Sequence, residues 1–267
     1  MPRTLPTYFI SHGGGPWPWV PQMRTRFATL ETSLRQMVAD HGEKPRAILM
    51  ISGHWEENNV AVMGAAKPTM LYDYSGFPPD TYSITYDAPG APDLAARTCD
   101  LLASAGIAAY VDPERGFDHG TFSVMEVMYP AADVPLFQVS MLTSYDPAAH
   151  LAIGRALAPL RDEGVMIIGS GLSFHNLPLM FNADAGRVPS AQFDDWLHDA
   201  MMADPVTRSQ AVIDWESAPA ARICHTNEDH LVPLFVALGA AEHDAATRIY
   251  HDVSEANGIT VSNYRFG

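Results

Sequence analysis

The chain has 267 residues, of which 47% are hydrophobic and 18% are charged, and its formal net charge is −15 at pH 7. This acidic balance excludes a protein that binds nucleic acid through the phosphate backbone, because such binding needs clustered Lys and Arg. No apolar run approaches the ~20 residues that cross a membrane, and the composition argues against disorder. We therefore expect one folded domain over residues 1–267, with neither nucleic-acid nor membrane partners.

The cysteines and the N-terminal segment indicate a reduced compartment. Cys99 and Cys224 are too few for a disulfide framework, and no Cys-x-x-Cys motif is present. The N-terminal segment reaches His12 too soon to contain the apolar region of a signal peptide. We therefore expect a soluble, cytoplasmic protein. No feature of the sequence indicates an oligomeric state.

Short apolar runs alternate with segments of helical periodicity, which predicts an α/β domain with a largely parallel central sheet and helices on both faces. We expect strands at residues 7–10, 47–51, 60–63, 107–111, 135–141, 165–168 and 247–251. We expect helices at residues 23–40, 92–106, 121–129, 146–164, 190–201, 207–215 and 233–239, with Thr121, Asp146 and Ser190 as N-caps. Ligands of such sheets bind beyond the carboxyl ends of the strands, so we place the active site there.

Four of the eleven histidines share one setting. His12, His54 and His175 each follow an apolar run closed by Ser or Gly, and His119 lies in a Gly-flanked turn before a helix. Because a parallel sheet brings strand ends together, we expect these four to converge, and His230 at a helix start can face the same rim. The other six are expected to be solvated or capping residues: His41, His150, His198, His225, His243 and His251.

Converging imidazoles suit a divalent first-row metal such as Zn or Fe(II). Four closed ligands would make a structural site, whereas three ligands with an open position would make a catalytic one. The His-Glu-x-x-His motif of zinc proteases is absent. The glycines around Ser170 are too closely spaced for the nucleophile elbow of a serine hydrolase.

Five sequence blocks together carry a resemblance to a known family. They are SHGGGP at 11–16, SGHW at 52–55, GFDHG at 116–120, SGLSFHNL at 170–177 and EDHLVPL at 228–234, with GFP at 76–78 and YDAPG at 86–90 between them. In this order and spacing the chain resembles the class III extradiol ring-cleaving dioxygenases, in the branch similar to 4,5-DOPA extradiol dioxygenase. The matches extend over nearly the whole chain.

The resemblance implies a metal bound by three histidines, which match His12, His54 and His230. A histidine thus replaces the glutamate ligand of the protocatechuate-type members. The acid–base histidine of the family matches His175, and a second active-site histidine, which would contact O2 or substrate, matches His119. The resemblance further implies Fe(II) for activity, with Zn as an alternative bound metal to which His175 could become a fourth ligand. The implied reactants are a small aromatic diol of the catechol type and O2.

Two aromatic residues in or beside the matched blocks, Trp17 and Phe174, are candidate contacts for the substrate ring. The tyrosines of residues 72–86 join them, because a long loop rich in Pro, Gly, Tyr and Asp is typical of a binding segment. Two other functions use the same histidines: a Zn-dependent hydrolase and a zinc-binding protein without activity. The sequence does not indicate which catechol is cleaved or at which bond.

Overall fold

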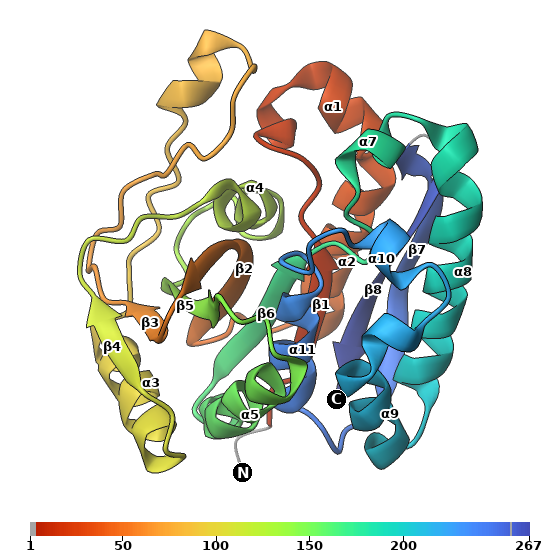
Figure 1. The fold of residues 1–267 in the computed structure, drawn as a ribbon. Helices are drawn as coiled ribbons and strands as arrows, with labels where there is room; N and C mark the ends of the chain where they lie inside the picture. Colours follow the sequence, from red (N-terminus) through yellow and green to blue (C-terminus); the bar gives the residue numbers. More distant parts are fainter. Residues whose placement is uncertain (1–3, 257) are drawn as a thin grey trace.

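Four apolar strands run parallel through the centre of the sheet of this computed structural model, which describes residues 4–256 and 258–267 (Figure 1). In spatial order they are β5 (Leu136–Leu142), β2 (Ala47–Glu57), β6 (Val165–Gly171) and β1 (Thr7–Ser11). Every residue of β1 and β6 is buried. Burial on both faces explains why these strands are unbroken apolar runs in the sequence.

The edges of the sheet are partly antiparallel. On one side β3 (Val60–Met63) runs antiparallel to β5 and pairs with β4 (Ala109–Asp112). On the other side β8 (Ile259–Phe266) runs antiparallel to β1 and pairs with β7 (Ala246–Ala256). Strand β8 was not predicted, because its polar residues alternate with apolar ones and break the apolar run that marks the central strands.

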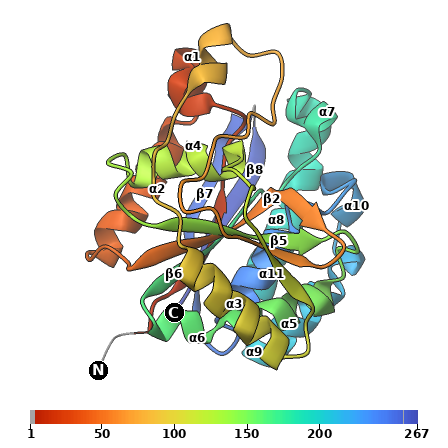
Figure 2. The same cartoon turned by 90° about the vertical axis from the view of Figure 1, so that its left-hand side faces the viewer.

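Helices cover both faces of the sheet (Figure 2). One face carries α2 (Ala28–His41) and α4 (His119–Met128), and the other carries α5 (Pro147–Leu157), α8 (Ala183–Met202) and α11 (Val232–Gly239). The predicted α/β class, with a largely parallel sheet between helices, is confirmed. Among the described residues, no helix combines the length and apolarity needed to cross a membrane. The remaining helices are α1 (Pro21–Arg26), α3 (Pro92–Ser104), α6 (Pro159–Asp162), α7 (Leu177–Met180), α9 (Pro205–Ile213) and α10 (Ala221–Cys224), with short 3-10 turns at Trp17–Trp19, Pro79–Ser83 and Trp215–Ser217.

Of the three predicted N-caps, one is confirmed. Asp146 caps α5 by accepting a hydrogen bond from a backbone N–H of its first turn. Thr121 is not a cap: it lies inside α4, and its backbone N–H donates to the true cap, Asp118. Ser190 is also inside a helix, where its hydroxyl bonds to the carbonyl of Arg187. In both cases the helix begins before the residue whose side chain suggested a start.

The carboxyl ends of β1, β6 and β2 lie at the same edge of the sheet, because the strand register pairs Ser11 with Gly171 and Ser52 with Ser170. In Figure 1 α1 and α7 stand above this edge, away from both chain termini. The active-site edge predicted from the strand ends is therefore also the edge where the matched sequence blocks meet.

One strand departs from the predicted boundary in a way that affects this edge. We expected β2 to end at Ser52-Gly53, but it continues to Glu57 and includes His54. Its register with β5 moves from Ile51 opposite Val139 to Glu56 opposite Met141, so extra residues bulge out of the ladder. Such bulges redirect side chains and occur next to active sites. His54 therefore lies in a bulge within the strand and not after it.

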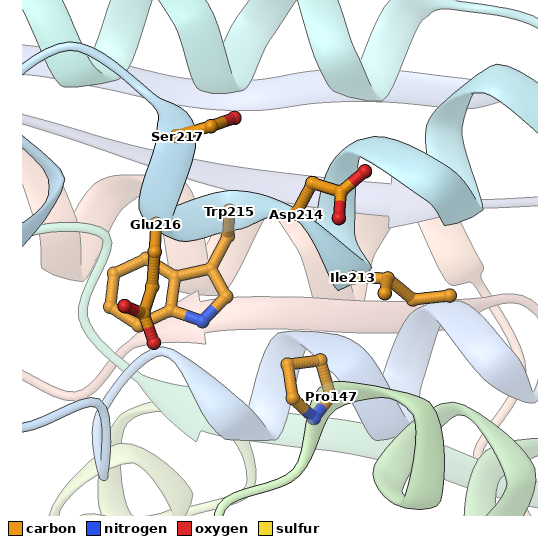
Figure 3. Close-up of a pocket in the computed structure, with 6 residues that line it drawn as sticks. All are labelled: Pro147, Ile213, Asp214, Trp215, Glu216 and Ser217. Atoms are coloured by element: carbon orange, nitrogen blue, oxygen red, sulfur yellow. The ribbon is translucent and has the colours of Figure 1, made fainter.

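Away from this edge, a surface cavity of about 400 Å³ lies between the start of α5 and the turn after α9. Figure 3 shows its six lining residues, Pro147 and residues 213–217. None of them is a histidine, and the cavity includes none of the matched sequence blocks. We assign no function to it.

Candidate metal centre and active site

Three histidines from distant parts of the sequence meet at the carboxyl edge of the sheet. His12 follows β1, His54 lies in the bulge of β2, and His230 precedes α11. The Nε2 atom of His54 lies 3.3 Å from Nε2 of His12 and 3.2 Å from Nε2 of His230. Two nitrogens bound to one ion at about 2.1 Å lie roughly 3.0–3.4 Å apart when the ligand angle is about 90–109°. The three imidazoles therefore fit one metal ion.

Glycines let these three segments approach one another. The backbone N–H of His12 donates to the carbonyl of Gly171, and the N–H of Leu172 donates to the carbonyl of His230. A Cβ atom at Gly171 would lie 2.1 Å from the carbonyl oxygen of His230. A Cβ atom at Gly53 would lie 3.1 Å from the carbonyl oxygen of Asp229. The Ser-Gly steps within β2 and at the end of β6 therefore leave room for the loop that carries His230.

A hydrogen-bond chain fixes the tautomer of His12. Its Nδ1 lies 3.2 Å from the hydroxyl oxygen of Ser170, and that hydroxyl donates to the carbonyl of Gly120 at 2.5 Å. Because a hydroxyl has one hydrogen, the Ser170 oxygen is left as an acceptor, and the proton of His12 must be on Nδ1. The lone pair on Nε2 then faces the other two histidines, as metal binding requires.

Carboxylates face the Nδ1 atoms of the other two histidines. Asp73 Oδ2 lies 3.3 Å from His54 Nδ1, and Asp229 Oδ2 lies 2.9 Å from His230 Nδ1. A negative carboxylate beside Nδ1 favours a proton on that nitrogen, so both imidazoles keep a proton on Nδ1 and a lone pair on Nε2. Asp73 was not among the site residues predicted from the sequence. The only signal that could have found it was its place among tyrosines in the aperiodic loop of residues 68–90.

The same two carboxylates reach the remaining pair of site histidines. His119 Nδ1 lies 2.8 Å from Asp73 Oδ1, and its ring centroid is 4.0 Å from that of His54. His175 Nδ1 lies 3.6 Å from Asp229 Oδ1, and its ring stacks on His230 with centroids 3.5 Å apart. The structure thus brings together all five histidines that the sequence analysis selected.

Burial keeps the three converging histidines neutral. Removal from water, together with repulsion between neighbouring imidazoles, lowers the pKa of His54 from 6.5 to about 4. Burial likewise lowers the pKa of His230 to about 3 and that of His12 well below its usual value. Burial raises the pKa of the Asp73 and Asp229 carboxyls, but their contacts with the neighbouring histidines outweigh this and leave both pKa values below normal. At neutral pH the three converging imidazoles are therefore neutral and the two carboxylates are ionised.

A buried ion pair supports this arrangement from below. Asp118 accepts hydrogen bonds from Ser52 on β2, Gln138 on β5 and the guanidinium of Arg115. Arg115 also donates to the carbonyl of His54 at 3.2 Å. Because Asp118 caps α4, this network fixes the first turn of that helix, where His119 lies, against the bulge of β2.

The two candidate ring contacts, Trp17 and Phe174, are both fully buried. The indole of Trp17 donates to the carbonyl of His12 at 2.9 Å and packs against Gly13, whose φ is +77°. In this structure Trp17 supports the backbone of His12, and Phe174 belongs to the hydrophobic core. Among the tyrosines of residues 72–86, Tyr74 contacts a site histidine, with its ring edge-on to His119 at 5.9 Å.

Two of the six histidines expected to be solvated or capping are instead buried core residues. His150 accepts from the N–H of Leu142 through Nε2 and bonds the carbonyl of Asp146 through Nδ1. His225 lies between aromatic rings and bonds the carbonyl of Ser173, two residues before His175. Hydrogen bonds to the backbone allow both to be buried, which the polar character of the residue did not predict. The other four are partly or largely exposed: His41, His198, His243 and His251.

The comparisons with known proteins agree with this geometry. Residues 7–267 match the family described as the catalytic LigB subunit of aromatic ring-opening dioxygenase. The chain is 37% identical to a 4,5-DOPA dioxygenase extradiol of Beta vulgaris, over 97% of this chain and 96% of that one. It is 36% identical to the dioxygenase tasH of Hapsidospora irregularis, over 98% and 85%.

A solved structure also agrees. The crystal structure of an uncharacterized protein from Escherichia coli K12 superposes with a TM-score of 0.76 at 26% identity, covering 98% of this chain and all of that one. A 4,5-DOPA dioxygenase extradiol of the same organism is 30% identical over 98% of this chain and 95% of that one. The chain therefore belongs to the LigB family of aromatic ring-opening dioxygenases and is an extradiol dioxygenase.

Proposed function

We propose that the protein is a non-haem Fe(II)-dependent dioxygenase that opens the ring of a catechol-type substrate with O2. The observation that supports this is the set of three neutral imidazoles of His12, His54 and His230. Nε2 of His54 lies 3.3 Å from Nε2 of His12 and 3.2 Å from Nε2 of His230. When bound, the ion supplies open coordination positions and lowers the pKa of a catechol hydroxyl. Both atoms of O2 enter the product, so no external reductant is needed.

His175 is the proposed acid–base residue. The carboxylate of Asp229 beside its Nδ1 favours a proton there and leaves Nε2 to accept a proton from the substrate hydroxyl. The His175 side chain is 19% exposed, so a ligand can reach it. His119, whose Nδ1 is bonded to Asp73, is proposed to contact O2 or the substrate. Tyr74 beside it is proposed to contact the aromatic ring.

The arrangement of His175 argues against a closed structural site. Its ligand atoms group with Asp229 and His230, and not with His12 and His54. The site therefore has three histidine ligands, and the side chain of one of them, His54, is 20% exposed. This arrangement corresponds to a catalytic site with an open position. The same donor set also fits catalytic Zn, so a Zn-dependent hydrolase is the second candidate function.

The test is O2 uptake by protein reconstituted anaerobically with Fe(II), supplied with a panel of catechols that includes DOPA, because several relatives are 4,5-DOPA dioxygenases. We expect catechol-dependent uptake of O2 and a yellow ring-fission product. Protein that retains iron but takes up no O2 with any catechol would overturn the proposal. Turnover of an ester or amide by the Zn-loaded protein alone would favour the hydrolase.

A further inference from the structure

We propose that Asp73 and Asp229 are paired positioning residues, each of which sets the tautomer of one metal-binding histidine and of one histidine that does not bind the metal. The inference rests on the proposed metal site, but it does not depend on which metal is native or which catechol is cleaved. It assigns a role to two carboxylates that the sequence blocks alone left without one.

The contacts of Asp73 divide between its two oxygens. Oδ1 accepts from the backbone N–H of His119 at 3.1 Å and faces the Nδ1 of the same residue at 2.8 Å. Oδ2 faces Nδ1 of His54 at 3.3 Å. Both imidazoles therefore carry their proton on Nδ1, and both Nε2 atoms have free lone pairs. One carboxylate thus prepares His54 for the metal and His119 for a ligand beside it.

The contacts of Asp229 follow the same plan with unequal distances. Oδ2 lies 2.9 Å from Nδ1 of His230, whereas Oδ1 lies 3.6 Å from Nδ1 of His175. The second distance exceeds a hydrogen bond, and within the described part of the chain Nδ1 of His230 also forms no hydrogen bond, so both are electrostatic contacts. The two rings stack with an interplanar angle of 19°, so His175 is held by the ring of a metal-binding histidine as well as by the carboxylate.

Both carboxylates make their ionic contacts with imidazoles. Among the described residues, neither Asp73 nor Asp229 forms an ion pair with Lys or Arg. Their negative charge is therefore shared between the two rings that each one contacts. A carboxylate on Nδ1 raises the basicity of a metal-binding imidazole and orients its ring, and loss of such a partner typically costs 10–100-fold in metal affinity.

The two asparagine variants are expected to lose different properties, metal affinity in Asp73→Asn and kcat in Asp229→Asn. In Asp73→Asn the amide oxygen stays with the two N–H groups of His119, and the amide NH2 then faces Nδ1 of His54. His54 must move its proton to Nε2, the atom that faces the metal. We expect the affinity for Co(II), measured by competition with a chromophoric chelator, to fall ~10–100-fold. Asp80→Asn, an exposed change in the same loop, is the matched control and should bind Co(II) as the wild type does.

In Asp229→Asn the amide oxygen is expected to stay with the closer partner, His230, so that the NH2 faces His175. Metal affinity should then change much less than in Asp73→Asn. With the site saturated by Fe(II), kcat should fall roughly 100-fold with little change in KM, because His175 has lost the lone pair on Nε2. Wild-type Co(II) affinity in Asp73→Asn, or wild-type kcat in Asp229→Asn, would overturn the inference.

A direct measurement covers the case in which a variant does not fold. Long-range ¹H–¹⁵N spectra of ¹⁵N-histidine-labelled wild-type protein, recorded with and without Zn(II), report which ring nitrogen carries the proton. We expect Nδ1–H in His54, His119, His175 and His230, and Nε2–H in any of them would overturn the inference for that carboxylate. Wild-type protein that binds Co(II) but takes up no O2 would count against the proposed function only, because the tautomers are read without turnover.

Discussion

The metal centre has two sides that are built differently. The Asp73 side, which contains His54, Asp73 and His119, is assembled from a strand bulge, an aperiodic loop and the first turn of α4. The Asp229 side, which contains His175, Asp229 and His230, places its carboxylate and its metal-binding histidine next to each other in the chain. Both sides nevertheless end with a carboxylate between two imidazoles.

The supports of the two sides differ in burial. Beneath the Asp73 side, Asp118 is fully buried and pairs with Arg115, whose side chain is 14% exposed. Beside the Asp229 side, Glu228 pairs with Arg222, whose side chain is 43% exposed. A side assembled from separate segments depends on a buried ion pair to fix their positions, whereas neighbours in sequence need less external support. We therefore expect the Asp73 side to lose more stability than the Asp229 side when its supporting ion pair is removed.

The largest effect should come from removing a histidine on each side. His54→Ala leaves two metal ligands, so we expect metal affinity to fall by more than the ~100-fold that loss of an orienting partner causes, and O2 uptake to disappear with it. His175→Ala should keep its metal and lose roughly 100-fold in kcat, because it removes a proton acceptor and not a ligand. Metal content after gel filtration and O2 uptake distinguish the two. Loss of metal in His175→Ala would make His175 a ligand.

A smaller effect separates the two supporting ion pairs. Asp118→Ala leaves the Arg115 guanidinium buried without its partner, so we expect the free energy of unfolding to fall by about 3–5 kcal/mol. Glu228→Ala breaks a pair that is partly exposed to solvent, and it should cost no more than about 1 kcal/mol. Urea denaturation of the metal-free proteins measures both. Equal losses in the two variants would contradict the difference in support between the sides.

The sequence predicted the parts of the site that follow regular elements. The apolar runs of β1, β2 and β6 marked where His12, His54 and the segment of His175 emerge, because strands buried on both faces carry a clear pattern. The extension of β2 into a bulge was missed, since the residues after Gly53 no longer alternate in a recognisable way. The placement of His54 at the site was nevertheless foreseen, because the bulge does not move it away from that edge.

The parts that could not be predicted depend on tertiary contacts. Asp73 lies in a loop without periodicity, and only the fold brings its carboxylate to His54 and His119. His150 and His225 were expected to be solvated or capping residues, and they are buried because backbone groups from other segments satisfy their ring nitrogens. Hydrogen-bond partners of this kind are chosen by the folded chain, so residue type alone does not identify them.

The last effect is a pH dependence that both sides should share. Burial lowers the pKa of His54 to about 4 and that of His230 to about 3, whereas both return to about 6.5 on unfolding. Below pH 6.5 the unfolded chain therefore binds more protons, so the stability contributed by neutral imidazoles is complete above pH 6.5 and is lost as the pH falls. At pH 5 each histidine should lower the free energy of unfolding by about 2 kcal/mol relative to pH 7.5.

Urea denaturation in the presence of a chelator, at pH 7.5 and pH 5, measures this difference in the free energy of unfolding. His54→Gln and His230→Gln should each reduce the difference in stability between the two pH values by about 2 kcal/mol. His243→Gln is the control, because His243 is exposed and its removal takes no buried imidazole away. An unchanged pH difference in either site variant would mean that its imidazole is not kept neutral by burial. If only one of the two variants changed the pH dependence, the two sides would differ in electrostatics as well as in support.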